Sequence, residues 1–133
     1  RIMAQFTDEE LGQLKARLQK RYLELREEVR GELERSGDQR YVDLAGSVAD
    51  PGDDSVADML LDLNAAIVDR QVREMREVET TLKRLAELDF GDCIECEGEI
   101  GFDRLMAYPT AQRCIRCQEF HEKTYSRENS PTL

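Results

Sequence analysis

Four cysteines constrain this chain more than any other feature, because they occur as two C-x2-C pairs separated by seventeen residues: Cys93 with Cys96, and Cys114 with Cys117. Each pair directs two thiolates toward one point, and two such pairs complete the tetrahedron that a zinc ion prefers. The four thiolates leave no position open for water or substrate. We therefore expect a structural zinc ion rather than a catalytic one.

Disulfides and a thioredoxin-like redox pair are the alternative interpretations of these cysteines. Disulfides are rare in a cytoplasmic protein, and a redox motif would need one pair on a βαβ scaffold rather than two pairs around an insert. The insert holds too little apolar material to fold without the metal, so zinc binding should supply much of its folding free energy. Its predicted core residues are Ile100, Phe102, Leu105, Met106 and Tyr108.

Basic residues near the cysteines are candidates to offset the negative charge of four thiolates around one Zn²⁺. They are Arg113, Arg116 and Lys123, for which a solvated helix face is the alternative interpretation. His121 lies four residues after the last cysteine. Because the ligand set is already complete, we predict that it is an ordinary residue of a short C-terminal helix.

Two long helices are predicted before the zinc unit. Thr7 and Glu10 form a capping box, which predicts a helix over about 7–36. A second helix, over about 54–88, follows a bend at about 37–53 that contains Gly and Pro. Leucine and other apolar residues recur at steps of three and four in both helices. The predicted seams are Leu11, Leu14, Leu18, Tyr22, Leu25, Val29 and Leu33, and then Leu60, Leu63, Ile67, Gln71, Met75, Val78, Leu82 and Leu85.

Each seam is too narrow for a lone stable helix, so the two helices should pack as an antiparallel coiled-coil hairpin roughly 40 Å long. A compact bundle is the alternative, but the rest of the chain supplies no further long helix. We thus predict a mainly α fold: a hairpin over 1–88, a zinc-finger unit with a short terminal helix over 89–127, and a flexible tail over 128–133.

The charge of the chain limits its partners. Charged residues make up 36% of the sequence and the formal net charge is −10, which is the wrong sign for direct binding to DNA or to an anionic membrane. The sequence has neither a spanning apolar run nor a secretory leader, so we expect a cytoplasmic protein. From Tyr41 to Asp69 the chain has seven acids and no Lys or Arg: Asp43, Asp50, Asp53, Asp54, Asp58, Asp62 and Asp69.

One or two of these acids can serve as helix caps, and others are expected to be ordinary carboxylates exposed to solvent. For Asp50 and Asp53 we favour a functional role, because a rigid arm with carboxylates at its tip is suited to probing a basic or metal-containing cavity.

The chain resembles the DksA/TraR family of bacterial transcription factors over nearly its whole length, most strongly in the zinc segment. The resemblance rests on the run Asp89-Phe90-Gly91-Asp92-Cys93, on Ile100-Gly101, Arg104-Leu105 and Pro109-Thr110-Ala111, and on Asp50-Pro51-Gly52-Asp53 at the bend. It implies a coiled-coil hairpin on a small zinc-finger part that binds RNA polymerase and inserts its tip through the secondary channel. Such factors change initiation without contacting DNA, often together with the alarmone ppGpp.

The family's tip pattern is Asp-x-x-Asp-x-Ala, and the resemblance implies polymerase-contacting roles for Asp50, Asp53 and Ser55. Ser55 stands where Ala is expected and adds a hydroxyl group. Three positions correspond to the family's basic ppGpp contacts, and of these only Arg70 is basic, the others being Glu77 and Gln118. A carboxylate at 77 would repel a polyanion, so we expect a weak response to ppGpp.

The leading hypothesis is a monomeric, non-enzymatic regulator of RNA polymerase with one structural zinc ion. A zinc ribbon that binds nucleic acid, or a protein-interaction module without polymerase activity, is the alternative. Residues 90–127 carry five bases and seven acids, so the basic stripe of a nucleic-acid binder is missing. A metal- or redox-dependent enzyme would need an open zinc position or an activated thiolate, and the sequence shows neither.

Overall fold

A computed structural model describes residues 6–39, 42–43, 45–46, 57–58, 60 and 66–128, with only the backbone of 126–128. These residues are mainly helical, in the order α1 (Asp8–Arg35), a 3-10 turn η1 (Ala66–Val68), α4 (Asp69–Ala86), α5 (Phe102–Ala107) and α6 (Ile115–Glu128). Extended pairing within this part of the chain is confined to one antiparallel bridge between Asp92 and Glu99. The predicted fold class is confirmed.

The first helix begins at the predicted capping box. The Glu10 backbone N–H donates to the Thr7 hydroxyl at 3.1 Å, and the Thr7 backbone N–H donates to Glu10 Oε1 at 2.9 Å. The helix runs for 28 residues to Arg35. Gly37 then takes a φ of 75°, which suits glycine and ends the helix.

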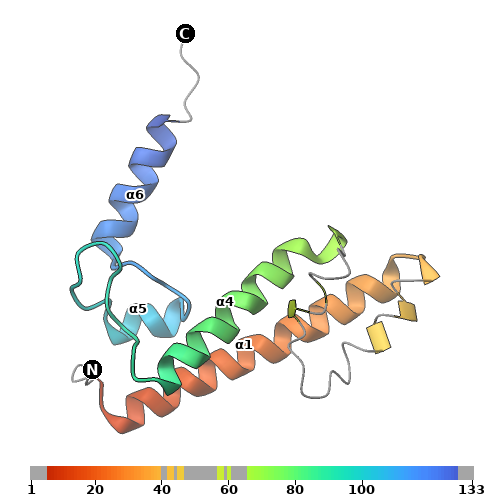
Figure 1. The fold of residues 1–133 in the computed structure, drawn as a ribbon, viewed down its shortest axis with the longest axis horizontal. Helices are drawn as coiled ribbons and strands as arrows, with labels where there is room; N and C mark the ends of the chain where they lie inside the picture. The colour runs from red at the N-terminus through yellow and green to blue at the C-terminus, as the bar shows by residue number, and fades with distance from the viewer. Residues whose placement is uncertain are drawn as a thin grey trace.

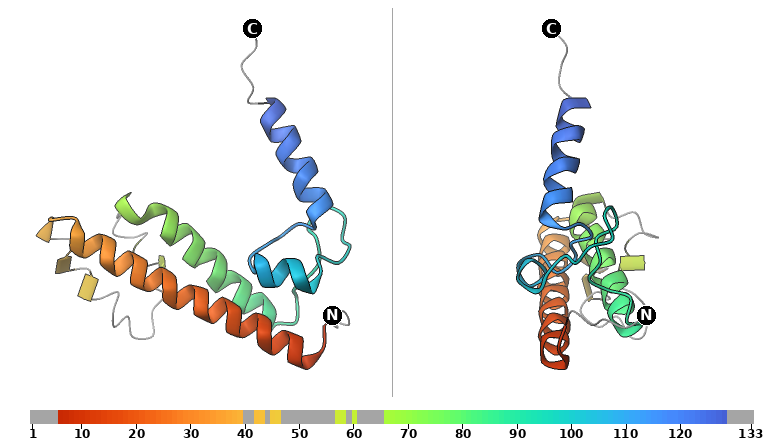
Figure 2. Two further views of the ribbon diagram at one scale, coloured as in Figure 1. Left: turned by 180° about the vertical axis from the view of Figure 1, so that it is seen from behind. Right: turned by 90° about the vertical axis from the view of Figure 1, so that its left-hand side faces the viewer.

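The helices α1 and α4 lie side by side and run antiparallel (Figure 1). Their facing seams form the main core, and a view along the hairpin shows them paired (Figure 2). Every predicted seam position of α1 is at least partly buried. Leu14, Leu18, Leu25, Val29 and Leu33 are fully buried, and they face Val72, Met75, Val78 and Leu85 of α4.

The start of the second seam differs from the prediction. Ile67 is 44% exposed and Gln71 is only partly buried, whereas Val68 and Val72 lie in the core. Val68, Val72 and Met75 follow one another at helical steps of four and three. This phase places two valines in the seam instead of an amide that would need a hydrogen-bond partner. Leu63 and most of the range 54–65 lie outside the described residues.

The segment after α4 folds back onto the base of the hairpin. The helix α5 packs on α1 through Leu105, which is fully buried, and the Phe6 and Phe90 rings lie 5.9 Å apart. The helix α6 then extends away from the hairpin, so that the molecule has two arms (Figures 1 and 2). None of the described helices is long and apolar enough to cross a membrane.

Candidate metal centre

The first cysteine pair lies on a tight backbone turn. The Cys93 N–H donates to the Gly98 carbonyl at 2.8 Å, and the Glu97 N–H donates to the Cys93 carbonyl at 3.0 Å. Glu97 has a φ of 63°, which closes the turn. The Gly98 N–H donates to Cys96 Sγ at 3.4 Å. Backbone hydrogen bonds thus hold both thiols of this pair on one side of the turn.

The second pair lies at the start of α6. Cys114 immediately precedes the helix, and Cys117 lies in its first turn. The Gln118 N–H donates to the Cys114 carbonyl at 2.9 Å, and the Ile94 N–H donates to the Gln112 carbonyl at 2.9 Å. The latter hydrogen bond brings the first turn against the segment that leads into the second pair.

The four sulfur atoms form one cluster. All four Sγ atoms lie within 4.8 Å of one another, and those of Cys96 and Cys114 are 3.9 Å apart. Four ligands at about 2.3 Å from a tetrahedral zinc ion would lie roughly 3.8 Å from one another. The spacing therefore suits zinc.

Two thiols of the cluster differ in their pKa values. Burial opposes ionisation of Cys93, but backbone N–H groups of Cys96 and Cys114 donate to this thiol and lower its pKa to about 6. Hydrogen bonding to Cys114, together with burial, raises the pKa of Cys117 to about 12. A bound dication would stabilise all four ligands as thiolates.

The predicted basic residues have different environments. Arg113 Nε donates to Glu95 Oε1 at 3.1 Å, across the two cysteine pairs, and its own carbonyl accepts from Arg104 Nε at 2.9 Å. Arg116 and His121 line a hollow of about 520 Å³ beside Cys96, Cys114 and Cys117. Lys123 is exposed.

The potential metal cluster found among the described residues contains the four cysteines and not His121. This is consistent with the prediction that His121 is an ordinary residue of the C-terminal helix.

The core of the zinc unit differs in part from the prediction. Ile100 and Leu105 are buried and Phe102 and Met106 are partly buried, but Tyr108 is 52% exposed and stacks under the Arg104 guanidinium. Phe90 and Ala111 complete the core. Each lies three residues before a cysteine pair, and this position in the sequence could have indicated that they are buried next to the metal cluster.

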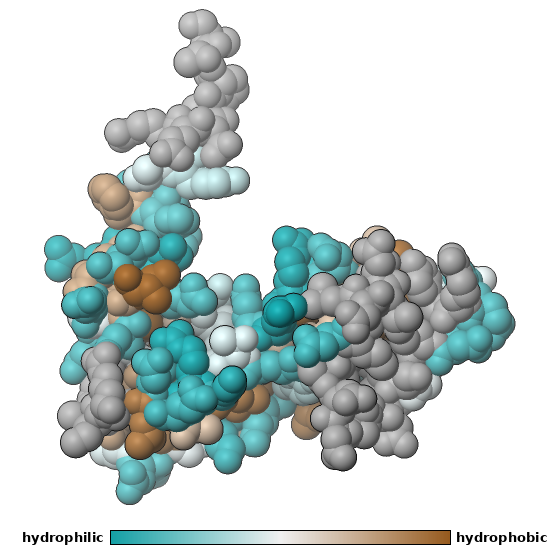
Figure 3. Space-filling view, in the orientation of Figure 1, coloured by the Kyte–Doolittle hydropathy of each residue, from teal (hydrophilic) through white to brown (hydrophobic). Residues whose placement is uncertain are grey.

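The surface of the zinc unit is partly apolar. Figure 3 shows hydrophilic residues over most of the visible described surface and hydrophobic residues gathered at the end that carries α5 and the base of α6. Exposed apolar residues of this end are Ile94, Tyr108, Ile115 and Phe120.

The remaining predicted site residues belong to the hairpin tip and to the possible ppGpp interface. Asp50, Asp53 and Ser55 lie outside the described residues. Arg70 is exposed in the first turn of α4, four residues before Glu74. Glu77 is on the same helix and Gln118 is on α6, where its side chain donates to Glu122.

Comparisons with known proteins agree with this architecture. Residues 89–123 match the prokaryotic dksA/traR C4-type zinc finger. The RNA polymerase-binding transcription factor DksA of Salmonella typhimurium is 36% identical over 104 residues, which are 77% of this chain and 68% of that protein. The Escherichia coli K12 protein of the same name is 35% identical over 97 residues, 73% of this chain and 64% of that protein. The alignments thus span about two thirds of these relatives.

A solved structure, that of transcription factor DksA2 from Pseudomonas aeruginosa, has a TM-score of 0.60 and 27% identity, covering 89% of this chain and 87% of that one. All four cysteines lie within the matched zinc-finger segment, so the prediction of a structural zinc ion is confirmed.

Proposed function

Because this chain belongs to the prokaryotic DksA/TraR family, we propose that it is a transcription regulator that binds bacterial RNA polymerase. The similarity to DksA of Salmonella typhimurium over 77% of the chain carries this proposal. The zinc ion stabilises the globular end, and the paired helices form a rigid arm. We expect the protein to act as a monomer in the cytoplasm, where bacterial RNA polymerase works.

The finer proposal is that the arm enters the secondary channel and brings Asp50, Asp53 and Ser55 toward the polymerase active site. The α1 helix alone is roughly 42 Å long. The C-terminal end of α1 and the N-terminal end of α4 both lie away from the zinc unit (Figure 1). In the sequence these two ends are connected by the segment that contains the seven acids, from Tyr41 to Asp69. The length of this arm and the negative charge of its connecting segment support the proposal that the tip reaches the polymerase active site.

The tip residues would act by charge and hydrogen bonding on elements of the polymerase. In this proposal the protein makes and breaks no covalent bond. The completed set of four zinc ligands supports a regulatory role, since an ion without an open position offers no site for substrate.

A competition experiment tests binding and tip action separately. The chain should displace a known secondary-channel factor from RNA polymerase and alter single-round transcription. The double variant Asp50→Asn/Asp53→Asn should still compete but lose the transcriptional effect. Asp43→Asn/Asp58→Asn, which removes two carboxylates from the same acidic region, is the matched control and should retain the effect. Failure of the wild type to compete would reject the proposal.

The response to ppGpp should be weak. Arg70 is an exposed candidate contact, but Glu77 lies two turns further along α4. Burial, together with the charge of Glu74, raises the pKa of Glu77, because both disfavour the ionised carboxylate. Glu77→Lys should increase stimulation by ppGpp in a promoter assay. Equal stimulation of the wild type and the variant would count against this interpretation.

A zinc ribbon that binds nucleic acid is not favoured, because the relatives are polymerase-binding factors and acids outnumber bases over 90–127. Titration with random duplex DNA at low salt should show no binding. Micromolar affinity would support this alternative instead.

A further inference from the structure

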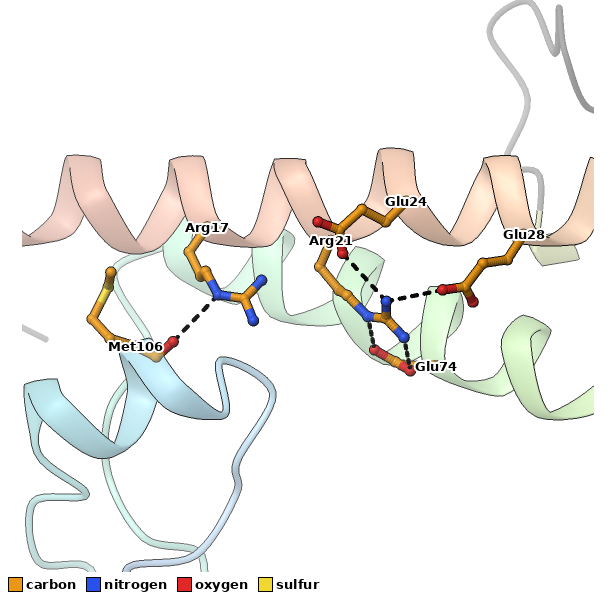
Figure 4. A network of polar contacts seen from close by, with 6 residues as sticks. All are labelled: Arg17, Arg21, Glu24, Glu28, Glu74 and Met106. Carbon is orange, nitrogen blue, oxygen red and sulfur yellow. Dashed lines mark hydrogen bonds and ion pairs between the residues drawn. The ribbon is translucent and has the colours of Figure 1, made fainter.

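One edge of α1 contacts both of its neighbouring helices. Arg17 and Arg21 lie one helical turn apart on this edge, as Figure 4 shows. Arg21 donates to the Glu74 carboxylate of α4. Arg17 Nε instead donates to the backbone carbonyl of Met106 in α5, at 3.3 Å. Two arginines on one edge therefore connect the first helix to the rest of the hairpin and to the zinc unit.

The carbonyl of Met106 needs a partner from outside its own helix. The α5 helix has only six residues, Phe102–Ala107, and the last four carbonyls of any helix lack intrahelical donors. A guanidinium group at this end satisfies one of them with a charge-assisted hydrogen bond. Residues 17 and 106 are 89 positions apart in the sequence, so the bond joins two separate parts of the fold.

The other contacts at this junction are less directional. Leu105 is fully buried in the hydrophobic core that also contains the α1 seam, and the Phe6 and Phe90 rings lie 5.9 Å apart. Apolar contacts of this kind stabilise the junction, but the hydrophobic effect is non-directional. Arg84 Nε donates to the Asp89 carbonyl at 3.1 Å, but these residues are only five apart and the bond closes a local turn. The Arg17 bond, by contrast, is directional and long-range.

We propose that Arg17 is a positioning residue that fixes the orientation of the helical hairpin relative to the zinc unit. Its consequence for polymerase rests on the function proposed above. If the zinc unit docks outside the channel and the hairpin enters it, the orientation at this junction decides where the tip arrives. A tilt of about 10° would displace the end of a helix of this length by roughly 7 Å.

A distance measurement on the free, zinc-loaded chain tests the orientation directly. Two spin labels are introduced through noncanonical residues, so that the four cysteines stay available to zinc. They replace Arg35, near the end of α1, and Asp103, on α5, which are both exposed. Arg17→Met keeps an apolar stem but removes the donor, and should broaden or shift the distance distribution. Lys20→Met removes another cation from the exposed part of α1 and should leave the distribution unchanged.

Arg17→Lys is the conservative variant, and it should restore part of the wild-type distribution because an ammonium can also donate to the carbonyl. Zinc content and helicity should stay at wild-type values in all variants. If Arg17→Met lowers helicity, the distance distributions of Arg17→Lys and Lys20→Met are compared instead, and only that of Arg17→Lys should differ from the wild type. A wild-type distribution in Arg17→Met, or a Lys20→Met change of equal size, overturns the proposal.

Competition for RNA polymerase tests the consequence. Arg17→Met should bind roughly threefold to tenfold more weakly, the range expected for loss of one such hydrogen bond, and Lys20→Met should bind like the wild type. A changed orientation with unchanged competition rejects the role in binding. If the wild type itself fails to compete, the proposed function fails, while the distance measurement still decides the role of Arg17.

Discussion

Arg21 holds the carboxylate of Glu74 with two parallel hydrogen bonds, from Nε to Oε2 at 2.5 Å and from Nη2 to Oε1 at 2.8 Å. The pair joins α1 to α4 at the middle of the hairpin (Figure 4). Arg21 also lies 3.3 Å from carboxylate oxygens of Glu24 and Glu28. A two-pronged contact of this kind fixes the longitudinal register of two helices in a way that a narrow apolar seam does not.

The Arg21 and Glu74 pair should therefore contribute measurably to stability. A double-mutant cycle with Arg21→Met and Glu74→Gln should give a coupling energy of about 1 kcal/mol, near the upper end for partly exposed pairs. The exposed pair of Arg30 and Glu27, which lies within α1, is the matched control and should give a smaller coupling. Urea denaturation measures both, and equal couplings would argue against a special role for the interhelical pair.

The same pair predicts a pH dependence. Hydrogen bonding to Arg21 outweighs burial and lowers the pKa of Glu74 in the folded state. The stabilisation is then present above the usual pKa of an unfolded glutamate, about 4.3, and is lost as the pH falls through the lowered folded value. The stability difference between the wild type and Glu74→Gln should thus shrink from pH 7 toward pH 3. A difference that is constant over this range would contradict the assignment.

Two leucines of α1 allow a matched test of the seam. Leu25 is fully buried and Leu23 is 59% exposed, and both lie in the middle of the same helix. Leu25→Ala should destabilise the fold by about 2–5 kcal/mol, because it removes buried contacts and leaves a cavity. Leu23→Ala should change stability by less than about 0.5 kcal/mol. Similar losses for both variants in thermal or urea unfolding would mean that the helices are not paired as described.

Removal of zinc should affect the two ends of the molecule unequally. Chelation, or Cys114→Ser, should abolish the bound zinc and unfold the unit after Leu88, since metal binding supplies its folding free energy. Helical circular dichroism should persist in large part, because the seam between α1 and α4 contains no metal ligand. Thiol labelling should be slow before chelation and fast after it, and added zinc should restore protection in the wild type. Stoichiometric zinc in Cys114→Ser would contradict the four-cysteine site.

Local signals in the sequence were sufficient for several elements. The capping box at Thr7 and the seam of α1 depend on residues within a turn or two of each other, so spacing alone identified them. The two C-x2-C pairs predicted the metal cluster for the same reason, since zinc restricts both the residue type and the spacing of its ligands. In both cases the spacing of the residues along the chain determines how their side chains lie in the structure.

Other features depend on tertiary context. The apolar spacing allows two helical phases at the start of α4, and packing against α1 selects the one that buries Val68 rather than Ile67. Tyr108 was predicted in the core, yet its ring lies at the surface beside Arg104. The bond from Arg17 to Met106 spans most of the chain and uses a backbone acceptor, so the sequence contains no side-chain pattern for it.

Two glycines give opposite expectations for the same substitution. Gly101 precedes α5 with a φ of 100°, and a Cβ added there would meet no atom within 4 Å. Gly101→Ala should therefore destabilise the zinc unit through backbone strain alone, by roughly 1–3 kcal/mol. Gly12 lies within α1, with equally open space around an added Cβ, and Gly12→Ala should stabilise the chain by about 1 kcal/mol through helix propensity. Both changes add one methyl group without a clash, so only the backbone conformation distinguishes them. Thermal unfolding and zinc retention measure the two effects, and stabilisation by Gly101→Ala would show that residue 101 does not need the positive φ.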